Sequence, residues 1–309
     1  MSRRATIVAA MVVALVVAAS AAAPLWSSHV AGTGPSTTHA SPDDRVVVDG
    51  QRHSVLSADG SPVGPTLGSR FFLGADGQGR DVMVRLLYGA RNSLLIGAAA
   101  TLLTLLLAVP LALLAGYLRG PVDGALRALL EVVWAFPVIL LGIALGVALA
   151  LGGLEVGPLE IASGSLLIPI AVIGLVYVPY AARPLRAQVA ALREREFVDA
   201  ARVSGAGSLR IMASELLPNL YSTLLTLAPL LLANAILLEA ALSFLGAGVQ
   251  PPSPSWGTML ADGVERVTTA PHAAIVPGAA LVASVLAVNF LGEAFRDHLD
   301  ARASLRPAR

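Results

Sequence analysis

Residues Ser93–Tyr117 read SLLIGAAATLLTLLLAVPLALLAGY and contain no charged side chain. A helix that crosses a bilayer needs about 20 mostly apolar residues to cover roughly 30 Å of hydrocarbon. The stretch is long enough for this, whereas buried strands and helices of soluble proteins rarely need an uninterrupted apolar run of that length. It therefore predicts a transmembrane helix.

The rest of the chain repeats this pattern. Of 309 residues, 56% are hydrophobic and 13% are charged, which is about half the charged fraction of a soluble domain. Nearly every apolar segment contains a proline, which in lipid indicates a kinked helix within a packed bundle. We expect an all-α integral membrane protein with six transmembrane helices. The predicted spans are residues 5–25, 93–117, 126–151, 166–182, 220–244 and 273–291.

The arginines predict the orientation. All 21 basic residues are arginine, and they cluster in the connection after the fourth span and in the tail after the sixth, whereas the connection near residues 153–163 has none. Positively charged connections stay in the cytoplasm. Both termini should therefore be cytoplasmic, with residues 26–92 external and a cytoplasmic tail at 297–309.

The first span has two interpretations. Arg3-Arg4, an apolar core and the small residues Ser20–Ala23 also resemble a secretory signal with a cleavage site. Because the apolar run is longer than the usual signal core of about 7–15 residues, we expect residues 1–25 to remain as a transmembrane anchor. The chain from Trp26 emerges outside in either case.

The external segment has a different composition, rich in small and polar residues. Residues 46–55 predict a short β-hairpin that turns at Asp49-Gly50. Three histidines, His29, His39 and His53, are irregularly spaced, so we expect them to be solvated and not to bind a metal.

Residues 192–219 read LREREFVDAARVSGAGSLRIMASELLPN. The pattern predicts two short helices, 192–203 and 208–217, on either side of the breaker 204–207, where glycine permits a positive φ and a sharp reversal. Pro218 is expected to end the second helix. The two helices would form a compact knob on the cytoplasmic face, and the small side chains of Ala200 and Ala201 would let a partner backbone approach closely.

The knob resembles a known motif. The matching stretch starts with Asp199-Ala200-Ala201, and three residues later comes Gly205. Nine further residues precede a four-residue ending that closes on Leu217-Pro218. This spacing is similar to the EAA loop in permease subunits of binding-protein-dependent ABC importers. Asp199 replaces the family's Glu, and Glu215 stands where the family often has Ile or His. Two further stretches, 72–94 and 242–300, resemble the C-type permease of the dipeptide, oligopeptide and nickel subfamily.

This resemblance implies a function. The chain would form, with a sister permease, the path by which short peptides enter a bacterial cell through its plasma membrane, using a core domain at 93–296. An external binding protein would deliver the peptide. The coupling loop 192–218 would dock on separate ATPase subunits through Asp199, Ala200, Ala201, Gly205, Leu217 and Pro218.

The chain itself is not expected to be an enzyme. It has no glycine-rich phosphate loop and no lysine, so ATP and Mg²⁺ would be held by two ATP-binding partner subunits. We expect no cofactor or metal in this chain, and membrane lipid but no nucleic acid among its partners.

Some polar and aromatic residues have two interpretations. Asn234 and Glu239 lie in the fifth span and are candidates for lining the path, because polar groups at membrane depth are often functional; for Glu239 we favour the alternative of a structural partner. Tyr177 and Tyr180 are expected to pack between helices. Trp256 is expected at the lipid headgroups or on the binding protein.

Three other functions are alternatives to the import of peptides. The same architecture could import a nickel chelate or another small solute. A secondary transporter would need an inverted repeat with broken helices, and no internal repeat is found. An enzyme embedded in the membrane would need clustered His, Asp or Glu inside the spans, and none of the five histidines lies in one.

Overall fold

The uncharged stretch forms the middle of α3 (Val82–Leu118), the longest helix in the computed structural model, which describes residues 3–41, 44–48, 51–152, 154–156 and 159–304. The helix begins well before Ser93 because Asp81 caps it. The Asp81 carboxylate accepts from the backbone N–H groups of Met83 and Val84 at 2.9 and 3.1 Å, and from Phe71 at 2.6 Å. Burial raises the pKa of Asp81, and these hydrogen bonds oppose the rise.

Four described helices are each long and apolar enough to cross a membrane. Two bent pairs supply two more spans if each pair is one crossing, at 85° for the first and 40° for the second. The helices then follow one another in the predicted order, so the predicted fold is confirmed. The single helices are α1 (Arg3–Ala21), α3, α11 (Tyr221–Phe244) and α13 (His272–Ser304); the pairs are α4 (Gly120–Trp134) with α5 (Val138–Gly152), and α6 (Leu167–Val176) with α7 (Val178–Leu192).

Prolines explain where the pairs bend. Pro137 lies between α4 and α5, and Pro179 lies in the first turn of α7, just after the break at Tyr177. A proline lacks the N–H that would continue the ladder, and it disfavours helical backbone in the residue before it. Pro110, Pro229 and Pro277 lie inside helices that continue past them.

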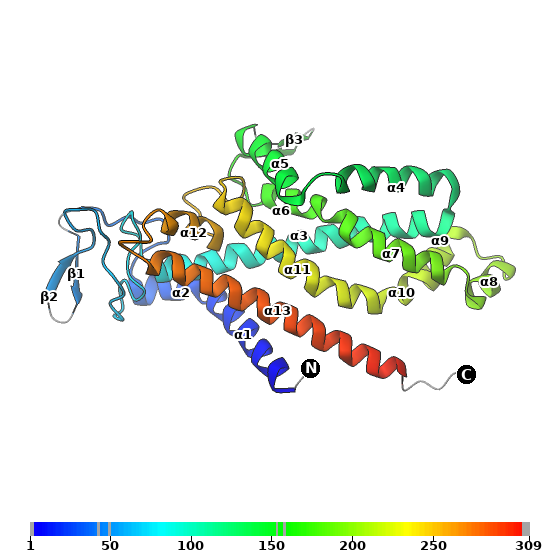
Figure 1. The fold of residues 1–309 in the computed structure, drawn as a ribbon, viewed down its shortest axis with the longest axis horizontal. Helices are drawn as coiled ribbons and strands as arrows, with labels where there is room; N and C mark the ends of the chain where they lie inside the picture. The colour runs from blue at the N-terminus through cyan, green and yellow to red at the C-terminus, as the bar shows by residue number, and fades with distance from the viewer. Residues whose placement is uncertain (1–2, 42–43, 49–50, 153, 157–158, 305–309) are drawn as a thin grey trace.

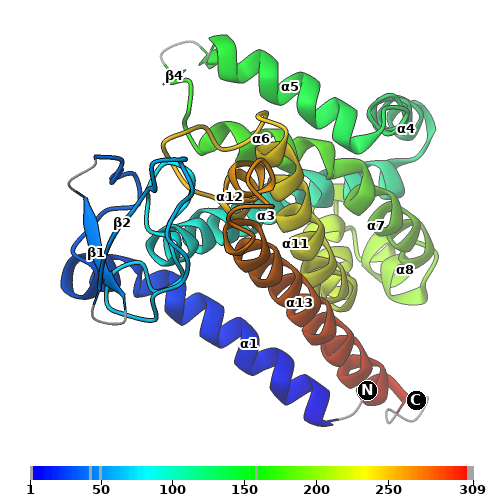
Figure 2. The ribbon, with the colours of Figure 1, turned by 60° about the vertical axis from the view of Figure 1, so that its left-hand side comes forward.

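Helix α3 is the central element. It runs along the long axis of the molecule and packs against α6, α7 and α11, while α13 packs against α11 and α1 (Figures 1 and 2). The pair α4–α5 lies on the outside of the bundle: α4 packs against α3 and α7, and α5, bent by 85° from α4, packs against α6 and α11 (Figure 1).

One end of the bundle carries the segment before α3, and we call it the hairpin end. Strands β1 (Arg45–Val48) and β2 (Gln51–Ser54) pair antiparallel with Arg45 opposite Ser54, so the predicted hairpin is confirmed, although its turn residues 49–50 lie outside the described part of the chain. Here α1 continues into α2 (Ala23–Leu25) and a π-helical turn, η1 (Trp26–Ala31).

Two elements in the connections between spans were not predicted. A second antiparallel hairpin, β3 (Leu154–Val156) with β4 (Leu159–Ile161), follows α5. The loop after α11 contains α12 (Trp256–Val264), which begins at a capping box between Ser255 and Thr258.

The expectations for Trp256 were wrong. Its side chain is 1% exposed and packs in a cluster with Ala90, Ile236 and Val285, which belong to α3, α11 and α13. The indole therefore holds α12 against three spanning helices, and neither lipid headgroups nor a binding protein can reach it. A capped helix buries this ring, and the loop composition gave no sign of that burial.

Candidate functional site

The knob, residues 192–219, lies at the opposite end of the bundle, which we call the knob end (Figure 1). Its first helix, α8 (Glu196–Val203), starts later than predicted because Leu192 still belongs to α7. The second helical segment runs past Pro218 to Asn219, as α9 (Ser208–Arg210), η2 (Ile211–Leu216) and α10 (Leu217–Asn219). Pro218 does not end it, because it lies in the first turn of α10, where a missing N–H is tolerated.

Gly205 forms the turn between the two segments. Its φ is +81°, a left-handed conformation that disfavours side chains. The Gly205 N–H donates to the Arg202 carbonyl and the Ala206 N–H to the Ala201 carbonyl, both at 3.0 Å. This pair of bonds is a Schellman motif with glycine at its left-handed position, and it gives the predicted sharp reversal.

Buried apolar side chains fasten the knob to the bundle. Val198 of α8 and Ile211 and Leu216 of η2 are almost fully buried, and they cluster with Tyr117 of α3 and Val189 of α7. Because protein interiors are close-packed and transmit displacement, a push on the knob reaches α3 and α7 directly.

Two arginines pack on Tyr117. The guanidinium carbons of Arg193 and Arg202 lie 5.7 and 5.5 Å from its ring centroid, within the range of cation–π attraction. Hydrogen bonding to Tyr117 and the charge of Asp199 raise the pKa of Arg202 above its ordinary value, so this side chain stays charged. Asp199 pairs with Arg202 at 2.8 Å.

The knob exposes large apolar side chains among charged and polar ones. Val203 is 90% exposed and Leu209 is 78% exposed, and Phe197, on the same helix as Val203, is exposed as well; we call these three residues the crown. Ala200, Leu217 and Pro218 are also exposed, whereas Ala201 is half-buried against the knob's own core. The predicted coupling residues thus lie in one knob, though Ala201 faces inward. Exposed apolar patches commonly mark interaction sites.

A cavity of about 450 Å³ opens on one side of α11, among α5, the α6–α7 junction and α11. Its polar groups are Asn234, Tyr177 and Tyr180, and Tyr177 donates its hydroxyl to the Asn234 carbonyl at 3.2 Å. The Asn234 side-chain amide makes no hydrogen bond to the described residues. We call this cavity the Asn234 pocket. It is lined by Val138, Ile139, Tyr177, Tyr180, Asn234, Leu237, Leu238 and Ala241.

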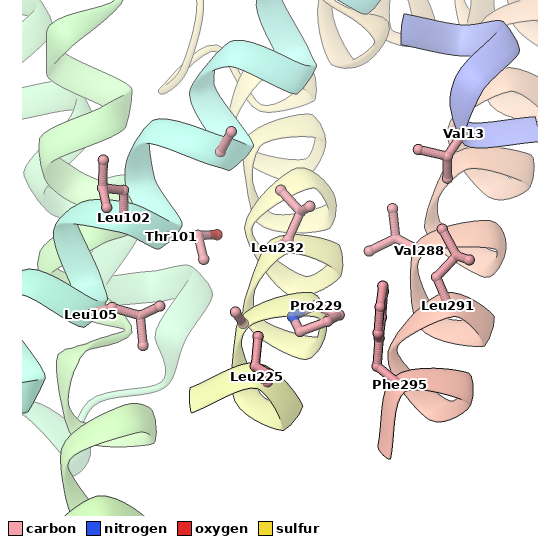
Figure 3. Close-up of a pocket in the computed structure, with 12 residues that line it drawn as sticks. Val13, Thr101, Leu102, Leu105, Leu225, Pro229, Leu232, Val288, Leu291 and Phe295 are labelled. Atoms are coloured by element: carbon pink, nitrogen blue, oxygen red, sulfur yellow. The ribbon is translucent and has the colours of Figure 1, made fainter. Parts of the chain in front are cut away.

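A second cavity of about 440 Å³ lies among α1, α3, α11 and α13 (Figure 3). At about 100° per residue, its α11 residues Leu225, Pro229 and Leu232 lie on the side of α11 opposite to the Asn234 pocket. The one hydroxyl in its lining belongs to Thr101 and already donates to the Gly97 carbonyl at 2.7 Å. This crevice suits hydrocarbon and offers a polar solute no free group.

Glu239 lines neither cavity. Its side chain is fully buried, and the Ser243 hydroxyl donates to one carboxylate oxygen at 2.7 Å while itself accepting from the Val249 N–H at 2.9 Å. Its other carboxylate oxygen, Oε2, is buried and has no hydrogen-bond partner in the described part of the chain. Ser243 thus links the Glu239 carboxylate of α11 to the loop that follows this helix, which is the contact expected of a structural partner. Tyr177 and Tyr180 pack on each other, as expected, and they also line the Asn234 pocket.

No metal site accompanies these features: in the described part of the chain no group of three His, Asp or Glu side chains lies close enough together to hold an ion.

Comparison with known proteins gives consistent matches. The model of the family "Binding-protein-dependent transport system inner membrane component" matches residues 108–305. A di/tripeptide transport system permease protein of Pseudomonas aeruginosa is 38% identical over 76% of this chain and 73% of its own length. A glutathione permease protein of Pectobacterium atrosepticum is 34% identical over 76% and 73%, and an oligopeptide permease protein of Haemophilus influenzae is 34% identical over 77% and 72%.

One structural match supports the fold. A chain of the MetNI methionine ABC transporter, in an inward-facing conformation, superposes with a TM-score of 0.55 over 72% of this chain and 98% of that chain, at 20% identity. At this level of sequence identity, the similarity supports the arrangement of the helices and nothing more.

Proposed function

The chain belongs to the family of binding-protein-dependent transport system inner membrane components, and on this premise we propose that it is a permease subunit of an ATP-driven importer of short peptides. The observation that carries the substrate class is the cargo named for its relatives, which is di- and tripeptides, glutathione and oligopeptides. All of these are short peptides, although they differ in length and side chains.

The knob end is the cytoplasmic end in this proposal, so that both termini are cytoplasmic and the hairpin end is external. Six arginines between residues 183 and 210 support it, since positive connections stay inside. The hairpin end would then receive a peptide-loaded binding protein, and α12, fixed to α3 and α11 by Trp256, would lie beneath it.

The knob couples this chain to a separate ATPase subunit. Its crown would enter a groove of the ATPase, Gly205 would hold the turn that presents it, and Asp199, Ala200, Leu217 and Pro218 would lie at the edge of the contact. Because the base of the knob packs on Tyr117 and Val189, closure of two ATPase subunits would move α3 and α7 as a rigid body. ATP and Mg²⁺ would be bound by the ATPase subunits alone.

The path lies on the side of α11 that carries the Asn234 pocket. This side has free polar groups at membrane depth, whereas the crevice of Figure 3, on the other side, has none. A sister permease would close the open side, since polar groups in a membrane face the bundle interior or water. The elements around the pocket, which are α5, the α6–α7 junction and α11, would then enclose the peptide together with the sister chain.

The test is the ATPase activity of the complete complex in proteoliposomes, with the partner permease, the ATPase subunits and the binding protein. Di- and tripeptides should stimulate hydrolysis and accumulate inside the vesicles. Stimulation by a nickel chelate, with no response to peptides, would replace the substrate class while keeping the architecture. Cargo uptake that continues without ATP, driven by an ion gradient, would overturn the importer assignment.

A further inference from the structure

One arginine near the Asn234 pocket has an aromatic partner and, among the described residues, no acidic one. The guanidinium carbon of Arg183 in α7 lies 4.4 Å from the ring centroid of Trp134, the last residue of α4. Trp134 in turn packs on Tyr180 at 4.2 Å between centroids, and Tyr180 on Tyr177 at 5.4 Å. Because both tyrosines line the Asn234 pocket, this row of rings extends from the pocket to Arg183.

The neighbouring arginine shows what Arg183 lacks. Arg186 follows one turn later in α7 and holds Asp123 with two bonds of 2.6 Å. Arg183 is half-buried, yet among the described residues it has no ion pair and no hydrogen bond. Since the Trp134 ring is the partner of its guanidinium in the described part of the chain, the N–H donors of Arg183 are available to a ligand.

The position of Arg183 relates it to the path. It follows Tyr180 by three residues in α7, so it lies about 4.5 Å further along the helix axis, toward the knob end. A solute that moved from the hairpin end to the knob end would therefore meet the Asn234 pocket first and Arg183 next. The face of the guanidinium packs on the Trp134 ring. The edge of the guanidinium, which carries its N–H donors, therefore stays available to a ligand.

A carboxylate fits that edge, because guanidinium and carboxylate are both planar and can form two parallel bonds. Every linear peptide carries one carboxylate at its C-terminus whatever its side chains. A single arginine would thus recognise the whole substrate class without selecting among sequences. We propose that Arg183, oriented by Trp134, binds the C-terminal carboxylate of the peptide as it leaves the Asn234 pocket. The proposal rests on the proposed function.

The experiment compares one dipeptide as its free acid and as its C-terminal amide. Uptake is measured in vesicles with the complete complex, each cargo being present at a concentration that saturates the binding protein, as established separately by calorimetry. The wild type should transport the acid about tenfold faster than the amide, since a bond to a charged group contributes at least that factor. Because every variant is tested with the same binding protein, any change in the acid-to-amide ratio of uptake is caused by the substitution in this chain.

Arg183→Gln should lower uptake of the acid about tenfold and leave uptake of the amide unchanged, so that the ratio falls to about one. Arg183→Lys, which keeps the charge but loses the planar edge, should give an intermediate ratio. Arg91→Gln removes an exposed arginine near the start of α3 and should keep the wild-type ratio.

Two results would overturn the inference alone. If Arg183→Gln lowers uptake of the acid and of the amide equally, Arg183 stabilises the fold or binds a lipid phosphate or a carboxylate of the sister chain. If the acid-to-amide ratio does not change, the cargo does not contact Arg183. If the wild-type complex transports neither peptide form but accepts another solute, the proposed function fails first, and the inference fails with it.

Discussion

The backbone N–H of Ala206 donates to the carbonyl of Ala201 at 3.0 Å, and this bond closes the turn that Gly205 makes possible. A β-carbon built on Gly205 would meet no atom of this chain within 4 Å. Within the chain, then, the glycine is required for its positive φ and not for space. A docked ATPase would add a second requirement, because its surface would occupy the volume next to the turn.

Substitutions at Gly205 can separate these two requirements. Asn tolerates the left-handed conformation, whereas Ala is disfavoured there by roughly 1–2 kcal/mol, and a β-branched Val by more. We expect Gly205→Val to insert into the membrane and pair with the sister permease, yet to abolish transport and loosen the ATPase. If only φ matters, Gly205→Asn should transport normally; if the partner surface is close, it should fail as well.

The measurement is peptide uptake by vesicles with matched membrane levels of each variant, together with co-purification of the ATPase. Asp199→Ala is the comparison, since an exposed pair with Arg202 contributes less than about 1 kcal/mol. Wild-type transport by Gly205→Val with a dead Asp199→Ala would show that the knob acts through charge and not through shape.

The crown gives a second prediction for the same surface. Val203→Asp and Leu209→Asp place a charge on side chains that are almost fully exposed, so the fold of the isolated chain should not change. If the crown is buried by the ATPase, each variant should lower ATPase affinity at least tenfold, because an unpaired charge is costly to bury. Val47→Asp, at an exposed apolar position in β1, is the control and should not affect ATPase binding. Unaltered binding by both crown variants would exclude the crown from the contact.

The sequence predicted most of the fold and part of the site. The order of the spans and the turn at Gly205 follow from apolar runs and glycine, which are local signals. The helix starts and ends were less accurate, because Asp81 extends α3 and Pro218 lies within a helix it was expected to end. The burial of Trp256 and the neighbourhood of Arg183 depend on contacts between distant helices, and no local pattern reports those.

The proposed orientation can be tested with single cysteines, since the chain has none of its own. Ser57, before α3, and Ser208, in the knob, are both exposed. In intact cells, Ser57→Cys should react with an impermeant maleimide, and Ser208→Cys should react only after the cells are opened. The reverse labelling pattern would invert the topology and place the knob beyond the reach of any cytoplasmic ATPase.

Two carboxylates at the hairpin end should differ in their effect on stability. Asp76 and Arg80 are both buried and pair at 2.6 Å, whereas Asp262 of α12, which also meets Arg80 at 2.6 Å, is 40% exposed. Breaking a buried ion pair leaves an uncompensated charge and costs about 3–5 kcal/mol of stability. Where the partner is exposed, water can take over part of the interaction that the lost carboxylate made. Asp76→Asn should therefore lower the thermal midpoint in detergent clearly more than Asp262→Asn.

Amide exchange of the segment before α3 gives a second measurement for this pair. Asp76→Asn should increase exchange around β1 and β2, because the segment would lose its attachment to α3 and α12. Equal effects of the two variants would mean that burial does not decide the strength of these ion pairs.

The last prediction separates the roles of Asn234 and Glu239, which lie about one and a half turns apart on α11. Glu239→Ala should lower the free energy of unfolding by about 1–3 kcal/mol, since the removed carboxylate is fully buried and leaves the buried Ser243 hydroxyl without its acceptor. Glu239→Gln keeps one acceptor oxygen and should cost less. Asn234→Ala removes an amide that makes no bond to the described residues, so it should leave stability nearly unchanged while altering the rate of peptide uptake. Thermal unfolding and uptake, measured on the same preparations, distinguish the two roles. A stable Glu239→Gln protein with altered preference among peptides would instead mean that Glu239 faces the path in a conformation other than this one, with α12 moved away from α11.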